Sequence, residues 1–135
     1  LLDEVRSLLW ERTGILRDEA GLEDGLARLD EIRTRAADLA VGDRRSRSYE
    51  FALNLGFALI VADGVLRSAR ERTESRGAHF RTDYPETDTE WQRNILLRRD
   101  SVGTPSLSTD TAGAPSEAVQ KALDADYELD YHQLE

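Results

Sequence analysis

The spacing of apolar residues predicts one long helix over residues 48–75. Apolar side chains recur there every third or fourth position, which places them on one helical face: Phe51, Leu55, Leu59, Ala62, Leu66 and Ala69. Other apolar residues lie elsewhere around the same helix: Leu53, Phe57, Ile60, Val61 and Val65. A helix that is apolar around most of its circumference is typical of the middle of a bundle. We therefore expect a central core helix, with Ser48 as N-cap and Gly77 beyond its end.

Two shorter amphipathic patterns precede this segment. A first helix that ends near Gly14 is marked by its apolar residues: Leu2, Val5 and Leu9. A second helix, over residues 19–40 with Asp18 as N-cap, is marked by a longer stripe: Leu22, Leu26, Leu29, Ile32, Ala36 and Leu39. Short loops join the helices, so we predict an all-α fold, a three-helix antiparallel bundle in spectrin-like up-down-up order over residues 1–76.

Small residues interrupt the surface of the long helix. Gly56 and Gly64 each cost about 1 kcal/mol of helix propensity relative to alanine. Ala52 and Ser68 lie close to them in the sequence. Because small side chains leave notches, we expect a neighbouring element to approach this helix closely.

The helical pattern stops at Gly77. Residues 77–93 have no repeating apolar spacing and contain Pro85, which predicts an ordered loop with a short turn over residues 90–93. The apolar run that leads into two arginines over residues 95–99 favours a strand. We expect this strand to pair weakly with residues 106–108.

The remaining residues are polar and rich in turn formers. Residues 101–114 contain many Ser, Thr, Gly and Pro residues, which indicates a loop or linker. Ser116 is placed to cap a short last helix with an apolar side: Ala118, Val119, Ala122 and Leu123. We predict that residues 77–135 form an irregular extension packed on the bundle, with an acidic tail after Asp124 that is mobile or docked on another surface.

The chain is acidic, with a net charge of −9, and Lys121 is its single lysine. This balance disfavours nucleic acid as a partner, because phosphates need a basic footprint. The many carboxylates would suit a protein from high salt, although a GC-rich genome would also replace lysine by arginine. No cysteine is present, which excludes disulfides, zinc–thiolate sites and thiol catalysis. No uninterrupted apolar run is long enough for a membrane span, and no signal peptide is visible, so we expect a cytoplasmic location without direct membrane insertion.

Both ends of the sequence indicate a piece of a longer protein. The chain begins Leu1-Leu2-Asp3-Glu4, with neither a methionine nor a cap before the first apolar pattern. It ends in Leu134-Glu135, which is typical of the remnant of an expression tag.

The strongest candidate site follows the long helix and consists of Arg76, His79, Arg81 and Asp83. Two guanidinium groups, an imidazole and a carboxylate on a glycine-containing loop have the chemistry to bind an anion or an acidic substrate. The same groups also suit a structural network that ties the loop to the helix end and to a neighbouring domain. We favour the structural interpretation.

Other candidate sites are weaker. His79 and Asp83 have the spacing of helical metal ligands, but Gly77 and Pro85 argue against a helix there. The acidic pattern from Asp124 onwards resembles a calcium loop that lacks its glycine. We therefore expect no metal site.

Salt bridges and packing account for the remaining conspicuous side chains. Helical spacing predicts exposed ion pairs between Arg70 and Glu74 and between Arg67 and Glu71. Trp10 and Trp91 are interpreted as packing anchors.

The segment around the candidate site resembles the C-terminal helical domain of the succinate dehydrogenase and fumarate reductase flavoproteins. Members of that family show a helix rich in Leu and Ala, then E-S-R-G-A-H, R-x-D-x-P, an acidic patch and a Trp. The corresponding residues here are Glu74–His79, Arg81–Pro85, residues 86–90 and Trp91. The resemblance covers about residues 1–100, including the loop 14–22, and is most specific over 71–91. The related L-aspartate oxidases share E-S-R-G-x-H and D-Y-P, whereas Arg81 and Trp91 look more like the dehydrogenase branch.

This resemblance implies an enzyme that exchanges two hydrogens between succinate and FAD and passes electrons to an iron–sulfur subunit. The family's substrate-binding and FAD-linking residues lie upstream of this domain, so the resemblance implies no catalytic and no cofactor-binding residue in this chain, which would be inactive alone. It implies contact with the flavin-binding domain of the full-length chain and with the iron–sulfur subunit, through Arg76, His79, Arg81, Asp83 and Trp91. That assembly would be peripheral at the inner face of the cell membrane. The alternatives are an L-aspartate oxidase and, from another class, a free-standing helical interaction module.

Overall fold

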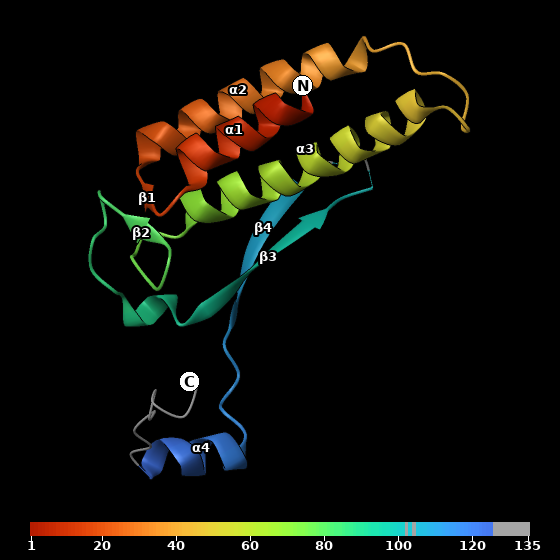
Figure 1. Ribbon diagram of the computed structural model, residues 1–135. Helices are drawn as coiled ribbons and strands as arrows, with labels where there is room; N and C mark the ends of the chain where they lie inside the picture. Colours follow the sequence, from red (N-terminus) through yellow and green to blue (C-terminus); the bar gives the residue numbers. More distant parts are fainter. Residues whose placement is uncertain (102, 104, 126–135) are drawn as a thin grey trace, which may run out of the picture.

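Three helices pack side by side as a bundle, and a hairpin lies against one of them (Figure 1). The computed structural model describes residues 1–101, 103 and 105–125. The helices are α1 (Leu2–Thr13), α2 (Glu19–Ala37) and α3 (Arg47–Glu71). Successive helices run in opposite directions (Figure 1). The predicted three-helix antiparallel bundle is confirmed.

The core of the bundle contains most of the residues that the apolar stripes predict. Its fully or nearly buried members are Val5, Leu8, Leu22, Leu29, Ile32, Leu55, Leu59, Ala62, Leu66 and Ala69. Burying a leucine side chain contributes about 2 kcal/mol, so this cluster supplies the main driving force for folding. The ends of two stripes, Leu39 and Phe51, are exposed and line a cavity beside the loop between α2 and α3.

The N-cap of α3 differs from the predicted residue by two positions. Ser46, and not the predicted Ser48, is the N-cap, and its Oγ accepts a hydrogen bond from Tyr49 N at 3.2 Å. Asp18 caps α2 as predicted and accepts from Gly21 N at 2.7 Å. The loop 38–46 therefore ends in a defined cap.

The second apolar face of α3 lies outside the bundle, although its sequence predicted a helix buried on most sides. Its residues Leu53, Phe57, Ile60, Val61 and Val65 are all exposed. Among the described residues, α3 is also the one helix long and apolar enough to cross a membrane by length and composition alone. That indication is weak, because a packed core helix meets the same criteria. The opposite face of α3 is buried against α1 and α2.

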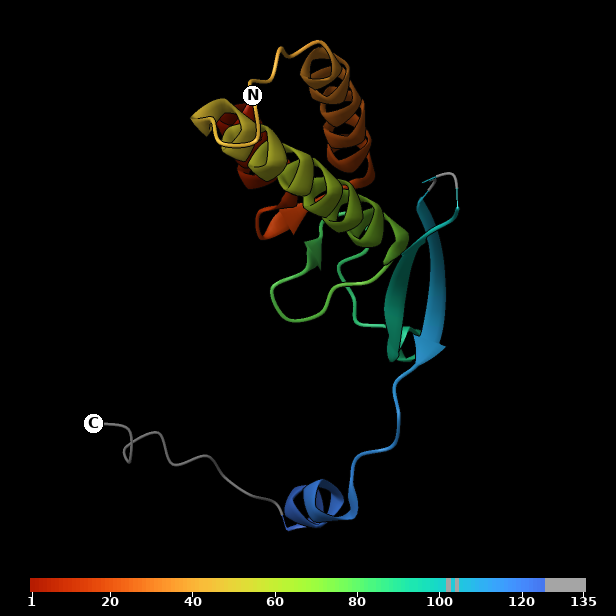
Figure 2. The ribbon, with the colours of Figure 1, turned by 90° about the vertical axis from the view of Figure 1, so that its right-hand side faces the viewer.

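The hairpin of β3 (Arg93–Arg99) and β4 (Pro105–Thr111) lies on the side of α3 away from α1 and α2 (Figures 1 and 2). Its strands are antiparallel, with Arg93 opposite Thr111 and Arg99 opposite Pro105. The predicted pairing is confirmed, but β4 is longer than expected and replaces much of the loop predicted over 101–114. Leu97 packs so closely on Gly64 that a Cβ there would lie 2.8 Å from its Cδ2 atom. This contact confirms one of the two predicted notches in α3.

A second, very short sheet joins distant parts of the chain. β1 (Leu16–Arg17) follows α1, and β2 (Phe80–Arg81) follows α3; the two strands are parallel. Phe80 N donates to Ile15 O at 3.2 Å and Thr82 N to Arg17 O at 2.8 Å. Two-residue strands carry no periodicity, so the sequence did not reveal this pairing.

The last described element is α4 (Glu117–Asp124), which stands apart from the bundle beyond an extended segment (Figures 1 and 2). Ser116 caps it as predicted, accepting from Val119 N at 3.4 Å. Its apolar residues Val119 and Leu123 are exposed. The predicted mobile tail and most of the calcium-like pattern lie outside the described residues, and the division into domains at residue 76 stays a prediction.

Candidate functional site

The candidate site is the segment that turns back from the end of α3 toward α1 and α2. α3 ends at Glu71 and Arg72 is its C-cap, four residues before the predicted end. Arg76 and His79 then exchange backbone hydrogen bonds of 2.8 and 3.0 Å around a tight turn. Gly77 occupies this turn with φ +58°, a left-handed conformation that glycine adopts without strain. The turn delivers β2 to the side of β1.

Ser75 holds this turn together from inside. It is buried, its Oγ accepts from Arg81 N at 2.9 Å, and the same hydroxyl donates to Tyr84 O at 2.8 Å. Its backbone N–H donates to Glu86 O at 2.9 Å. Ser75 is therefore a structural residue with its hydrogen-bonding capacity used internally.

Arg81 is completely buried at the centre of the segment. The acceptors of its Nη1 group are carbonyl oxygens at the end of α3: Ala69 (3.1 Å), Arg70 (3.0 Å) and Arg72 (3.3 Å). Its Nε and Nη2 groups both donate to Asp83, each at 2.7 Å, and Nη2 also donates to Glu19 at 3.0 Å. Each nitrogen of this guanidinium thus has an acceptor within the chain. The positive charge also suits the carbonyl-rich end of a helix.

Asp83 connects Arg81 to the beginning of α2. One of its oxygens accepts from Glu19 N at 2.9 Å, in the first turn of α2, where a negative charge is favourable. The hydrogen bonds from Arg81, followed by that backbone hydrogen bond, lower the pKa of Asp83 to about 2. The Tyr84 ring lies 4.9 Å from the Arg81 guanidinium and covers it.

A second buried carboxylate, Glu74, organises the other half of the segment. It is fully buried and accepts from Arg72 at 2.6 Å, from Arg76 at 2.9 and 3.1 Å, and from Asp88 N at 2.8 Å. The hydrogen bond from Arg76 is the largest of the causes that lower the pKa of Glu74 to about 2. The predicted exposed pair of Arg70 with Glu74 is wrong, because α3 ends before Glu74 and the chain turns away from Arg70.

Both arginines expected to pair along α3 find other partners. Arg70 bridges to Glu19 at 2.5 Å and to Glu23 at 2.6 Å on α2. Arg67 pairs with the buried Asp63 at 2.9 Å instead of with Glu71. Helical spacing alone reveals neither the contacts between helices nor the choice of Asp63 over Glu71.

His79 forms a neutral bridge between two helix ends. Its Nδ1 accepts from Arg17 Nη1, and its Nε2 donates to Arg72 O at 3.3 Å. Burial, together with the nearby guanidinium charges, lowers the pKa of His79, which favours this neutral form. Arg17 in turn donates to Thr13 O at 3.0 Å and Gly14 O at 2.8 Å, so it caps the end of α1.

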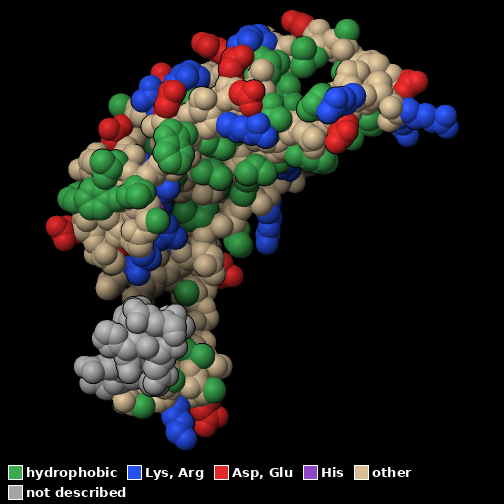
Figure 3. Space-filling view, in the orientation of Figure 1, with side chains coloured by type: hydrophobic (Ala, Val, Ile, Leu, Met, Phe, Trp, Pro, Cys, Tyr) green, Lys and Arg blue, Asp and Glu red, His purple; other side chains and the backbone are tan. Residues whose placement is uncertain are grey.

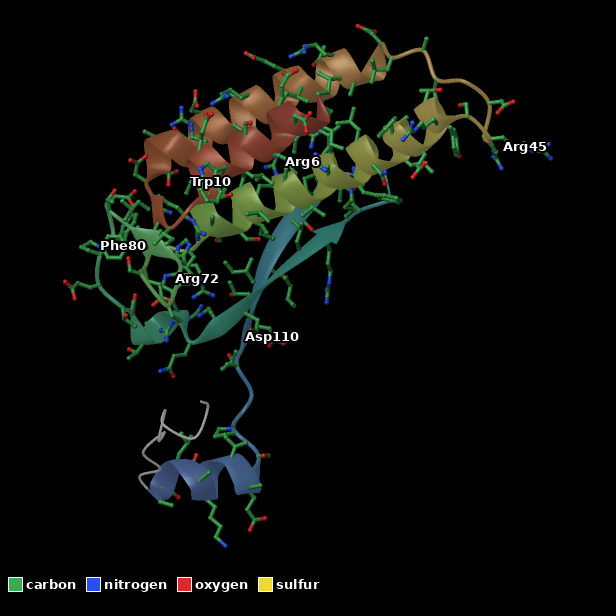
Figure 4. All side chains as sticks on the ribbon, viewed as in Figure 1. Arg6, Trp10, Arg45, Arg72, Phe80 and Asp110 are labelled. Carbon is green, nitrogen blue, oxygen red and sulfur yellow. The ribbon has the colours of Figure 1, made fainter. Side chains whose placement is uncertain are left out.

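Trp91 packs at the edge of the same segment, in the short 3-10 helix η1 (Thr89–Trp91). The Arg72 guanidinium lies 5.1 Å from its ring, and its indole N–H donates to Thr73 Oγ1 at 3.0 Å. Figure 4 shows Arg72 in the region between the end of α3 and η1. Trp91 is half-buried, as a packing anchor should be.

Trp10, in contrast, is 84% exposed, and its interpretation as a packing anchor is wrong. It projects from α1 at the end of the bundle that also carries Phe80 (Figure 4). Exposed Ile15 and Leu16 lie in the same region, beside a cavity of about 860 Å³. Among the described residues, no helix or strand packs over this side of α1.

The five predicted site residues lie in one segment but do not surround one open site. Arg81 and Asp83 form one network, Arg76 and Trp91 belong to another around Glu74 and Arg72, and His79 lies between them. Sequence reasoning missed the partners that complete these networks: Arg17, Glu19, Arg72, Glu74 and Ser75. Glu74 has a local signal, since arginines lie two positions before and after it. Glu19 has none, because it is distant in sequence.

The arrangement favours scaffolding over ligand binding. An anion that bound to Arg81 would have to displace carboxylate or carbonyl groups already bonded to its guanidinium, at a cost in buried ion pairs. Within the described part of the chain, no group of three or more His, Asp or Glu side chains is placed to hold a metal ion.

The chain is similar to known proteins in both sequence and fold. Residues 2–127 match the sequence model of the family described as "Fumarate reductase flavoprotein C-term". One protein of the fumarate reductase (CoM/CoB) of Methanothermobacter marburgensis is 42% identical over 100 residues, or 72% of this chain and 18% of that protein. The L-aspartate oxidase of Pyrococcus furiosus is 35% identical over 97 residues, or 72% of this chain and 17% of that protein.

Solved structures show the same fold. Mycobacterium smegmatis Sdh1 in complex with UQ1 superposes with a TM-score of 0.78 and 28% identity, covering 98% of this chain and 22% of that one. A mutant of the E. coli quinol fumarate reductase gives 0.74 and 26% identity over 86% of this chain and 22% of that one. The chain therefore spans about a fifth of the length of the relatives it matches.

Proposed function

Because the chain belongs to the family of fumarate reductase flavoprotein C-terminal domains, we propose that it serves as the C-terminal domain of a succinate dehydrogenase or fumarate reductase flavoprotein. FAD would be bound elsewhere in the full-length protein, which would interconvert succinate and fumarate by the exchange of two hydrogens. Electrons would pass to an iron–sulfur subunit, and the assembly would be peripheral at the inner face of the cell membrane. In such an enzyme the cofactor supplies the redox chemistry, while this domain supplies position and contact surface.

The observation that carries a structural role is the complete internal use of Arg81. An arginine that recognises a substrate carboxylate must present donors to an open cavity. Arg81 instead donates to the end of α3, to Asp83 and to Glu19, and it is fully buried. The Arg81 guanidinium therefore has no N–H donor left to bind a substrate carboxylate.

In this proposal, the surface that contacts a neighbouring domain or subunit is formed by the more exposed residues of the Arg81 and Glu74 networks. Arg76 is partly exposed while its guanidinium holds Glu74, and Trp91 and His79 are half-buried at the rim. Arg81 and Asp83 would hold the segment in place from below. In this proposal the segment is a rigid edge that faces the flavin-binding domain or the iron–sulfur subunit.

A second candidate function is the C-terminal domain of an L-aspartate oxidase, which needs no iron–sulfur partner. It is supported by the likeness to the P. furiosus enzyme, which covers the same share of the chain as the likeness to the M. marburgensis protein. The residues Arg81 and Trp91 favour the dehydrogenase branch by resemblance.

Isolating the native protein with an antibody raised against this chain tests the proposal. We expect a band several times heavier than 15.2 kDa that co-purifies with flavin and reduces an artificial dye when succinate is added. Release of hydrogen peroxide with L-aspartate instead would identify the second candidate.

A flavin-free band at the size of this chain would mean a free-standing interaction module and would refute both candidates. As a control, the isolated chain is titrated with FAD. We expect no stoichiometric yellow complex, because the resemblance assigns FAD binding to another part of the full-length protein.

A further inference from the structure

A cavity of about 420 Å³ lies beside α3, where residues of α2, of α3 and of the hairpin come together. Figure 2 shows the hairpin alongside α3. None of the five predicted site residues borders this cavity. Its volume is typical of sites that bind small molecules. The side chains that determine its chemistry are Arg33, Leu59, Ile60, Arg67, Leu97 and Arg99.

The lining of this cavity is positively charged, although the protein is acidic. Three guanidinium groups meet a single carboxylate, that of Asp63, whereas the whole chain has a net charge of −9. On the face of the bundle shown in Figure 3, by contrast, acidic and basic side chains lie among one another. A concave surface lined by one sign of charge concentrates ligands of the opposite sign. The cavity therefore favours an anion.

The arginines of this cavity are held in place and still offer donors to an anion. Arg67 holds Asp63 through Nε at 2.9 Å, and among the described residues no acceptor lies within hydrogen-bonding distance of its two Nη groups. Arg33 binds Asp63 only loosely, at 3.4 Å. Arg99 donates from Nε to Gly103 O at 2.9 Å, which positions its guanidinium group at the cavity. An anion could therefore bind here without displacing the carboxylate.

The remaining lining of the cavity is largely apolar. It includes Leu59, Ile60 and Leu97, of which the last two are 45% and 37% exposed. Gly56 also lines the cavity, and a Cβ at this position would meet nothing within 4 Å. The notch predicted at Gly56 is therefore present and widens the cavity, whereas Leu97 fills the notch at Gly64. A ligand that fits this space needs an apolar group next to its anionic group.

We propose that this cavity binds a small phosphate monoester that carries an apolar group. Arg67 and Arg99 would bind the phosphate, Arg33 would add positive charge, and the apolar group would contact Leu59 and Ile60. A phosphate monoester carries a charge of roughly −1.5 to −2 at neutral pH, which matches the excess of guanidinium groups better than a carboxylate does. Guanidinium groups also bind phosphate oxygens through two parallel hydrogen bonds. This binding site goes beyond the proposed function and does not depend on it.

Isothermal titration calorimetry of the full-length protein with phenyl phosphate tests this site. Inorganic phosphate and phenol are the matched probes, because the first lacks the apolar group and the second lacks the charge. We expect phenyl phosphate to bind, and inorganic phosphate to bind roughly tenfold more weakly, since it buries no apolar surface. Phenol should give no detectable binding.

Two variants of the full-length protein assign the binding to the cavity. Arg99→Gln removes one guanidinium group and should weaken the binding of phenyl phosphate roughly tenfold. Gly56→Leu fills the cavity without a change of charge and should abolish binding; it replaces a helical glycine where space is free, so the fold is kept. The matched control Arg98→Gln should leave binding unchanged, because successive side chains of a strand lie on opposite faces. Circular dichroism shows that each variant is folded.

Unchanged binding in both Arg99→Gln and Gly56→Leu would place phenyl phosphate elsewhere on the protein and overturn the proposal. The absence of binding to the unmodified full-length protein would overturn it too, and is the result expected if another part of the polypeptide fills the cavity. Binding of benzoate as tight as that of phenyl phosphate would overturn the choice of a phosphate. None of these results would contradict the proposed function.

Discussion

Arg81 performs at the end of α3 a task that is usually left to a C-capping turn. The last carbonyl groups of a helix lack partners within the helix, and they must be satisfied by other donors. Arg81 supplies these donors from a residue after the helix, while Asp83 and Glu19 balance its charge. A lysine could not replace it, since an ammonium group lacks the planar geometry and the number of donors. The residue therefore acts through geometry as much as through charge.

Glu74 offers the sharpest test at the scale of a single residue. Glu74→Gln keeps the shape but leaves Arg72 and Arg76 without a buried counter-charge, and one of its amide N–H groups would face other donors. We expect a loss of about 3 kcal/mol in the free energy of unfolding, measured with urea. The control Glu23→Gln removes an exposed carboxylate that pairs with Arg70, and it should change stability by less than about 0.5 kcal/mol. Equal effects of the two substitutions would contradict the buried network.

The pH dependence of stability should show two separate ranges. The pKa of His79 is lowered from its ordinary 6.5, so the unfolded chain binds the proton more readily, and stability is lost as the pH falls below 6.5. The pKa values of Glu74 and Asp83 are lowered to about 2, so their contribution is full above their ordinary values and is lost as the pH falls toward about 2.

Urea unfolding followed over a series of pH values measures both ranges. His79→Gln should remove the first range and keep the second. A stability profile that is flat from neutral pH to about pH 5 in the unmodified protein would contradict the neutral His79 bridge.

At the scale of elements, α3 differs most from its prediction, and tertiary contacts explain why. Apolar spacing located its buried stripe correctly from Leu55 to Ala69, because packing on α1 and α2 uses one face. The same spacing could not tell whether the second face meets a neighbour inside this chain. Its end was also misplaced, since the helix stops where Arg81 takes over its carbonyl groups, and Arg81 lies ten residues beyond Glu71.

Gly56 and Gly64 form a matched pair for testing how the hairpin meets α3. Replacing a helical glycine by alanine stabilises by about 1 kcal/mol where space is free, as at Gly56. At Gly64 the new Cβ would lie 2.8 Å from Leu97 Cδ2, so the leucine has to move and part of that gain is lost. We expect Gly56→Ala to raise the melting temperature of the isolated chain more than Gly64→Ala does. The opposite order would show that the hairpin does not pack on α3.

At the scale of the whole molecule, the charge balance affects stability through self-repulsion. The net charge is −9, and added salt screens repulsion between exposed carboxylates. Buried pairs such as Arg81 with Asp83 are screened much less. We therefore predict that molar KCl raises the melting temperature, as measured by circular dichroism. A melting temperature that is unchanged between low and molar salt would count against this effect.

The three-helix bundle could be predicted from the sequence, whereas only the location of the candidate site, and not its side-chain networks, could be predicted. The bundle follows from local periodicity, which each helix carries in its own residues, and the resemblance of residues 71–91 located the segment with the site. The networks depend on partners far apart in the chain, such as Arg17 with His79 and Glu19 with Arg81. No local pattern marks them. The mistaken interpretation of Trp10 has the same cause, because whether a tryptophan is covered depends on what else packs there.

The parallel pairing of β1 with β2 has a consequence for the order in which the chain folds. It closes a loop of roughly sixty residues, from Leu16 to Phe80, whereas each helix forms from contacts near in sequence. The ends of α1 and α3 must already be docked before these strands can meet. The turn with Arg17, His79 and Arg81 should thus be ordered after the rate-limiting step, so that weakening it speeds unfolding and leaves the folding rate nearly unchanged. The contacts of this segment would therefore determine the unfolding rate of the domain rather than its folding rate.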